Sequence, residues 1–197
     1  FGILSFGSVV LQLPFELYKI FVIEEKYGFN KMTPAVFIAD KLKGMLLGVI
    51  IGGILLSVLV MIYIGTGSNF WWLAWLTVSC VMLFATMFYA SWIIPMFNKL
   101  TPLPEGELRT AIEKYCRNAG FALNNIFVMN GSKRSSKANA FFSGLGKKKK
   151  IVLYDTLIEK HSTDELVAVL AHETGHYQLK HTRTGLFLGL LQTGLMF

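Results

Sequence analysis

Two histidines and a glutamate near the C-terminal end of the chain have the spacing of a metal-binding pair with an adjacent base. His172, Glu173 and His176 form a His-Glu-x-x-His pattern. Residues four positions apart stack on one face of an α-helix, because each residue turns the chain by about 100°. Both imidazoles can therefore reach one cation, and Glu173 lies on the adjoining side of the turn as a general base. This arrangement is typical of zinc peptidases.

The residues before this motif predict that it lies on a well-started helix. Ser162 and Glu165 have the spacing of a capping box, with Ser162 as N-cap. Leu166, Val169 and Leu170 follow at helical intervals. The alternative is that the two histidines are ordinary polar residues that bind nothing. The helical context favours the metal site, because the motif needs a helix to bring its side chains together.

The composition is not that of a soluble domain. Hydrophobic residues make up 53% of the 197 residues and charged residues only 16%. No Asp, Glu, Lys or Arg occurs between Lys43 and Lys99, and so long an uncharged run indicates membrane-spanning segments. The chain starts at Phe1 rather than at a methionine and stops inside an apolar stretch. We therefore expect it to be a piece of a longer protein.

The first half is predicted to be a membrane region, residues 1–98, made of four consecutive segments. They are a partial span over 1–13, an interfacial amphipathic segment over 14–43, and two spans over 44–64 and 70–97. Pro14 and Glu16 mark the expected exit of the first segment. A simple loop between spans is the alternative for the second. The uncharged turn between the last two spans predicts a helical hairpin.

Three glycines in the first full span suggest a place where another helix packs closely. Gly44, Gly48 and Gly52 recur every fourth residue, and small residues at this spacing let two backbones approach. The alternative is that they are unremarkable, since glycine is common in membrane helices.

The positive charge is concentrated after the hairpin. Residues 99–183 contain 14 of the 19 Lys and Arg residues, and the turn at 65–69 contains none. The positive-inside rule then places the polar region on the cytoplasmic side, of a bacterial inner membrane or of the endoplasmic reticulum.

The polar region, residues 99–183, is predicted to be a compact α+β domain. Its expected elements are a helix over 105–118 closed by Gly120, a short strand over 126–129, and two strands over 138–143 and 151–155 paired as a hairpin. The lysine run within that hairpin is most simply a solvated turn, with anionic lipid headgroups as the alternative contact. Residues 184–197 are expected to begin another membrane helix, or else to form a buried soluble helix.

The chain lacks an obvious third metal ligand. Catalytic zinc takes three protein ligands and a water, yet no Asp or Glu follows Glu173. His181 is five residues beyond His176, whereas a third histidine in the extended motif is six beyond. On a continuous helix His181 would also point about 140° away, so we reject it as a ligand. We expect one zinc per chain, a glutamate ligand beyond Phe197, and no activity from residues 1–197 alone.

Taken together, the motifs resemble the type 1 CAAX prenyl protease family, which are multi-pass membrane zinc metallopeptidases. The similarity extends over nearly the whole chain rather than resting on the metal motif. Besides that motif, it is carried by Leu13–Tyr18, Glu24–Pro34, Phe97–Leu103, Asn130–Ser136, Asn139–Phe142 and Ile151–Leu157.

The resemblance implies specific roles for residues of this chain. The two histidines of the motif would be zinc ligands, and Glu173 the catalytic base. Asn139, Ala140 and Phe141 resemble the family's edge strand, which lines the cleft and pairs with the substrate backbone. An exposed edge offers unpaired backbone groups, so this role is physically reasonable. Asn139 could add a side-chain hydrogen bond to substrate, or it could simply end a turn.

Two positions depart from the family pattern. Lys137 stands where many members have histidine, which bears on substrate preference more than on chemistry. Thr174 stands where an aliphatic residue is usual, and its hydroxyl is expected on the side of the helix away from zinc.

The resulting prediction is a multi-pass α-helical membrane protein with an α+β zincin-like metallopeptidase domain. It would hydrolyse peptide or prenylated-peptide substrates at the bilayer, without a nucleic-acid partner. One alternative is a heat-shock-type quality-control peptidase, and another is a non-catalytic scaffold that retains the zinc helix. A transporter is disfavoured, because the two full spans carry no charge.

Overall fold

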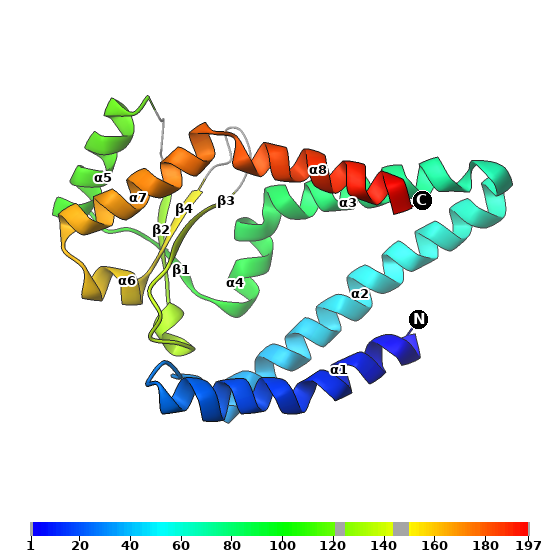
Figure 1. The fold of residues 1–197 in the computed structure, drawn as a ribbon, viewed down its shortest axis with the longest axis horizontal. Coiled ribbons are helices and arrows are strands. Elements are labelled where there is room, and N and C mark those ends of the chain that lie inside the picture. The colour runs from blue at the N-terminus through cyan, green and yellow to red at the C-terminus, as the bar shows by residue number, and fades with distance from the viewer. Residues whose placement is uncertain (1, 121–124, 144–149, 197) are drawn as a thin grey trace.

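A computed structural model describes residues 2–120, 125–143 and 150–196. Figure 1 shows long helices on one side of the molecule and a small sheet with shorter helices on the other. Two helical runs, Gly2–Glu24 and Pro34–Phe97, are long and apolar enough to cross a membrane. The structure thus has the helical region and the α+β region that the sequence predicts.

The first helix is longer than predicted. Helix α1, Gly2–Tyr18, continues as the π-helical stretch η1, Lys19–Glu24. Pro14, the expected exit of the first segment from the membrane, lies inside α1, so the helix does not end there. A proline removes one backbone N–H and leaves one carbonyl without its helical partner, which membrane helices tolerate. The boundary drawn between 1–13 and 14–43 therefore does not coincide with the end of a helix.

The second helix begins at a turn and forms the predicted hairpin with the third. Helix α2, Pro34–Thr66, is preceded by Thr33, whose hydroxyl accepts a hydrogen bond from the Val36 N–H at 3.3 Å. The short 3-10 turn η2, Gly67–Asn69, then leads into α3, Phe70–Phe88. The π-helical stretch η3, Tyr89–Ile93, and α4, Ile94–Phe97, complete this run.

The predicted glycine packing site is not formed in the described part of the chain. A Cβ added at Gly44, Gly48 or Gly52 would meet no other described atom within 4 Å. These glycines instead line an apolar groove of about 1040 Å³ between α1 and α2. Without a side chain they widen the groove rather than bring two helices together.

Close packing of helices occurs instead where α8, His181–Met196, lies along α3 (Figure 1). The Trp75 indole Nε1 donates a hydrogen bond to the Leu190 carbonyl at 3.0 Å. A Cβ added at Gly194 would lie 3.2 Å from that nitrogen. Helix α8 contains no buried residue in the described structure. The helix therefore lies along α3 without being enclosed by other described elements, and that residues 184–197 begin another membrane helix stays a prediction.

The sheet has four short strands in the order β1-β2-β4-β3. They are β1, Leu100–Pro102; β2, Ile126–Met129; β3, Ala140–Ser143; and β4, Lys150–Tyr154. Strands β3 and β4 are antiparallel, which confirms the predicted hairpin, whereas β2 and β4 are parallel. The connecting residues 144–149, with most of the lysine run, lie outside the described residues. Strand β3 is thus at one edge of the sheet.

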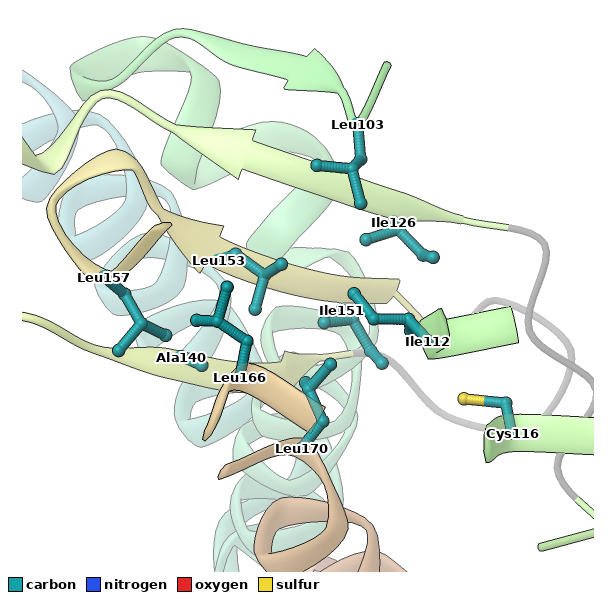
Figure 2. Close-up of a cluster of buried hydrophobic side chains, with 10 residues drawn as sticks. All are labelled: Leu103, Ile112, Cys116, Ile126, Ala140, Ile151, Leu153, Leu157, Leu166 and Leu170. Atoms are coloured by element: carbon teal, nitrogen blue, oxygen red, sulfur yellow. The ribbon is translucent and has the colours of Figure 1, made fainter. Parts of the chain in front are cut away.

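Helices cover the sheet on both faces. On one face lie α5, Glu107–Asn118; α6, Asp155–Lys160; and α7, Thr163–Gln178. Figure 2 shows Ile151 and Leu153 of β4 packed among side chains from these helices. Val152 points to the opposite face and packs with Ala90 and Ile94 at the end of the α3 run. The alternation follows from the two-residue period of a strand, and it joins the sheet to the membrane hairpin.

Candidate metal centre

Helix α7 begins with the predicted capping box. The Ser162 N–H donates to Glu165 Oε2 at 2.8 Å, and the Glu165 N–H donates to Ser162 Oγ at 3.4 Å. These reciprocal bonds satisfy backbone donors that the first turn of a helix leaves unpaired. They also hold the Glu165 carboxylate in its ionised form, so the pKa of Glu165 is lowered, chiefly by the Ser162 backbone hydrogen bond.

One face of α7 is bound to the sheet, and this orients the opposite face. Leu166, Leu170 and Thr174 follow one another at four-residue intervals, and each is at most 2% exposed. Figure 2 shows the two leucines pointing into the core. His172 and His176 lie about 140° around the helix from this face, and both are exposed. Burial of the leucines therefore turns both imidazoles away from the core.

The two imidazoles face each other with the geometry of a shared cation site. His172 Nε2 and His176 Nε2 are 3.1 Å apart. Two nitrogens bound tetrahedrally to one zinc, with bonds of about 2.0–2.1 Å, are about 3.3 Å apart. The pair therefore fits zinc with little adjustment. No group of three potential ligands occurs among the described residues.

His181 does not point away from the metal motif, so the geometric reason given for rejecting it is wrong. Helix α7 ends at Gln178, and Lys180 adopts the left-handed conformation with φ of 58°. The helical path is interrupted there, and His181 begins a separate helix, α8, which runs on along α3 (Figure 1). Its Nδ1 lies 2.7 Å from Nδ1 of His176. His181 therefore contacts the ring nitrogen opposite the proposed zinc-binding one, which is the usual position of a group that orients a metal ligand.

Glu173 is the one acidic residue of the motif. It is half-buried, and it makes no hydrogen bond or ion pair with any residue in the described ranges. Its place next to His172 on α7 is consistent with the predicted role of general base.

The predicted substrate strand lies at the sheet edge next to α7. The Tyr154 N–H donates to the Asn139 carbonyl at 3.0 Å, so Asn139 and Phe141 turn their backbone groups toward β4 and Ala140 turns its groups outward. The outward Ala140 N–H is bonded to Asn139 Oδ1 at 2.9 Å. The Asn139 side chain thus covers a backbone donor that a substrate strand would use.

The two departures from the family pattern have distinct environments. Lys137 Nζ lies 2.7 Å from Glu24 Oε1, so its charge is paired with the end of the first helix. Thr174 is 1% exposed, and its Oγ1 has no hydrogen-bond partner among the described residues. The hydroxyl lies on the face away from the histidines, as predicted, but it is buried without a partner.

An ion pair between two distant segments was not predicted from the sequence. Arg134, in the segment before the edge strand, contacts Asp40 of α2. No local pattern links residues so far apart in the chain. The only signal was that both belong to short polar stretches next to apolar ones.

With the fold and the metal motif established, comparison with known proteins defines the family. Residues 1–99 match the family model described as the CAAX prenyl protease N-terminal region with five membrane helices. Residues 102–197 match the model of peptidase family M48. The chain therefore belongs to the M48 peptidases of the CAAX prenyl protease type. Members of this family are metallopeptidases with a metal that is typically zinc.

Individual relatives agree with this assignment. The chain is 44% identical to CAAX prenyl protease 1 of Saccharomyces cerevisiae over all of its residues, which is 44% of the yeast protein. It is 37% identical to the Homo sapiens CAAX prenyl protease 1 homolog, with 96% of this chain and 48% of the human protein covered. The crystal structure of Ste24p from S. mikatae is 43% identical, with a TM-score of 0.93 over the whole chain and 47% of that protein. The chain thus spans about half the length of these relatives.

Proposed function

We propose that the protein is an integral-membrane zinc endopeptidase that cleaves C-terminal prenylated peptides. The observation that carries this proposal is the 3.1 Å separation of His172 Nε2 and His176 Nε2 on a helix beside the edge strand β3. Relatives named CAAX prenyl protease 1, at 44% and 37% identity, support the substrate class.

The roles of the residues follow from their positions. His172 and His176 would hold zinc, since their Nε2 atoms face each other. When bound, zinc supplies Lewis-acid chemistry, polarising the scissile carbonyl and making water a stronger acid. Glu173 takes a proton from the attacking water and passes it to the leaving amine. The substrate backbone lies along Asn139–Phe141, where the outward carbonyl of Ala140 accepts a hydrogen bond.

We further propose that one zinc is bound per chain and that its third protein ligand is a glutamate beyond Phe197. Catalytic zinc sites use three protein ligands, and the described residues supply only the two histidines. Relatives are about twice as long as this chain, so they contain further sequence from which such a ligand can come.

We place the catalytic region on the cytoplasmic side of the membrane. Fourteen of the 19 Lys and Arg residues lie in 99–183, and the hairpin turn at 65–69 has none. The hairpin of α2 and α3 returns the chain to the side where it started, so the loop before α2 and the sheet share that side.

The test is cleavage of a farnesylated C-terminal peptide by the full-length protein and by its Glu173→Gln variant. Removing a general base is expected to lower kcat about 10²–10⁴-fold, while zinc content and circular dichroism stay at parental values. Glu159→Gln, an exposed glutamate on α6, is the matched control and should cleave like the parent. Equal activity of Glu173→Gln and the parent would remove Glu173 from the mechanism.

The same assay separates the other functions. An unprenylated peptide cleaved as fast as the farnesylated one would favour a quality-control peptidase. A parent protein that folds but binds no zinc and cleaves neither peptide would be a scaffold that retains the zinc helix.

A further inference from the structure

The segment that joins β2 to the edge strand β3, residues 130–139, determines where the substrate strand begins. It is held on one side by the membrane helices and on the other by the sheet region. Because Ala140 starts β3, any displacement of the preceding residues moves the beginning of the strand with which a substrate would pair.

On the membrane side, Arg134 anchors this segment. Its Nε lies 2.7 Å from Asp40 Oδ2 and its Nη2 lies 2.9 Å from Asp40 Oδ1, which makes a two-point contact with α2. Nη2 also donates to the Phe97 carbonyl at 2.7 Å, and Nη1 donates to Asn98 Oδ1. One guanidinium thus joins the start of α2, the end of α4 and the segment before β3. The side chains of Arg134 and Asp40 are only 18% and 20% exposed.

Backbone hydrogen bonds reinforce this contact from the loop between the first two helices. The Lys31 N–H donates to the Arg134 carbonyl at 3.0 Å, and the Ser136 N–H donates to the Phe29 carbonyl at 2.9 Å. Asn30 and Ser135, which lie between these bonds, form an isolated antiparallel bridge. The loop 28–32 and residues 134–136 therefore behave as a short two-stranded contact.

On the sheet side, the same segment is bonded to the residues that follow β4. Thr156 Oγ1 donates to the Lys137 carbonyl at 2.9 Å, and Lys160 Nζ donates to the Ser136 carbonyl. These bonds and the Tyr154 N–H bond to Asn139 lead directly into the ladder between β3 and β4.

We propose that Arg134 and Asp40 are positioning residues for substrate binding, an inference that rests on the proposed peptidase function. The bidentate pair fixes residues 134–136 against the membrane helices, and this fixes the outer edge of β3 relative to α7. The ladder to β4 holds the strand from its inner side, so loss of the pair removes the two-point contact that holds the preceding residues against α2 and lets the outer edge shift. Misplacement by about 1 Å can reduce catalytic efficiency substantially, and here the loss should fall on substrate binding.

The first test is hydrogen–deuterium exchange of the full-length protein and its Asp40→Asn variant. The variant should exchange the backbone amides of residues 134–141 at least about tenfold faster, because hydrogen bonds such as that of the Ser136 N–H open more often. Exchange in α7 should not change. Lys41→Met is the matched control, because it removes the neighbouring ion pair between Lys41 of α2 and Glu16, whose side chains are 34% and 36% exposed. Unchanged exchange in Asp40→Asn would overturn the proposal.

The second test is kinetic and uses the farnesylated peptide. Arg134→Lys is expected to fold, because it keeps the positive charge opposite Asp40. It loses the two-point contact, because an ammonium group lacks the planar fork of a guanidinium. Its KM should rise about tenfold while kcat stays within about twofold and zinc content stays at the parental value. Lys41→Met should leave both constants unchanged. A fall in kcat at constant KM, or parental kinetics, would overturn the positioning role.

The two hypotheses fail in different ways. A parent protein that cleaves no peptide removes the proposed function, whatever the exchange data show. A parent that cleaves the peptide, with Arg134→Lys indistinguishable from it, retains the proposed function and removes the positioning role.

Discussion

The membrane hairpin and the sheet region use the same apolar residue types in opposite environments. Leu46 and Ile54 of α2 are 63% and 62% exposed, whereas Ile151, Val152 and Leu153 of β4 are completely buried. In the sheet region, removal of apolar surface from water stabilises the fold. In the hairpin, the apolar surface is matched to lipid, and backbone hydrogen bonds within each helix satisfy the polar groups. Replacing a leucine is therefore expected to change the free energy of unfolding by different amounts in the two regions.

The two regions meet at β4, whose side chains alternate between two cores. Ile151 and Leu153 belong to the core under α5 and α7, and Val152 packs with Ala90 and Ile94 of the α3 run. Helix α7 is thus joined to the membrane hairpin through this strand and, separately, through α8, which lies along α3. This arrangement explains how a site on the sheet region keeps a defined position relative to the bilayer.

The largest expected difference between the regions concerns one leucine in each. Leu153→Ala should lower the free energy of unfolding of the sheet region by about 2–5 kcal/mol, because it leaves a cavity in a fully buried core. Leu46→Ala should cost less than about 1 kcal/mol in detergent or lipid, because its side chain is exposed to the apolar solvent. Denaturant unfolding of both variants measures the comparison. Equal losses would show that α2 is packed in the folded protein and that the contrast is wrong.

A smaller effect, on zinc affinity, is expected at His181, the first residue of α8. His181→Ala removes the partner of His176 Nδ1, and it should weaken zinc binding about 10–100-fold. His161→Ala is the matched control, because His161 lies near Glu165 rather than the metal motif, and it should leave zinc affinity unchanged. Competition with a chelator gives both affinities.

Cobalt substitution then distinguishes the two possible roles of His181. If His181 only orients His176, the visible absorption spectrum of cobalt bound to His181→Ala keeps the form typical of tetrahedral coordination. A changed coordination spectrum in His181→Ala would mean that His181 is itself a ligand, which would contradict the assignment made from the ring-nitrogen contacts.

Local patterns predicted the elements whose cause is local. The capping box of Ser162 and Glu165 and the hairpin of β3 and β4 were both confirmed, since turn chemistry and strand alternation act over a few residues. The position of His181 was not predictable in this way. It depends on the left-handed backbone of Lys180, and a lysine gives no sign of that conformation in the sequence.

Contacts between distant segments were beyond the reach of sequence patterns. Arg134 and Asp40 are 94 residues apart, and their pairing is a consequence of how the sheet sits against the hairpin. The glycines at 44, 48 and 52 illustrate the converse. Their spacing permits close helix packing, but in the described structure they face an open groove, because spacing does not determine which surface another helix covers.

The smallest expected effect compares one buried hydroxyl in each region. Thr174 of α7 and Ser79 of α3 are 1% and 6% exposed, and neither hydroxyl has a hydrogen-bond partner among the described residues. Unfolding the sheet region transfers the Thr174 hydroxyl to water, where it regains hydrogen bonds. Thr174→Val removes this advantage of the unfolded state and should stabilise the region by about 1 kcal/mol.

Ser79 differs because its reference state is different. When α3 separates from its neighbours within a bilayer, it remains a helix surrounded by lipid, so the hydroxyl does not return to water. Ser79→Ala should therefore change stability by less than about 0.5 kcal/mol. Thermal unfolding of both variants in the same lipid measures the difference. A gain for Ser79→Ala equal to that for Thr174→Val would mean that unfolding hydrates α3 as fully as the sheet region, and the two regions would then follow the same energetic rule.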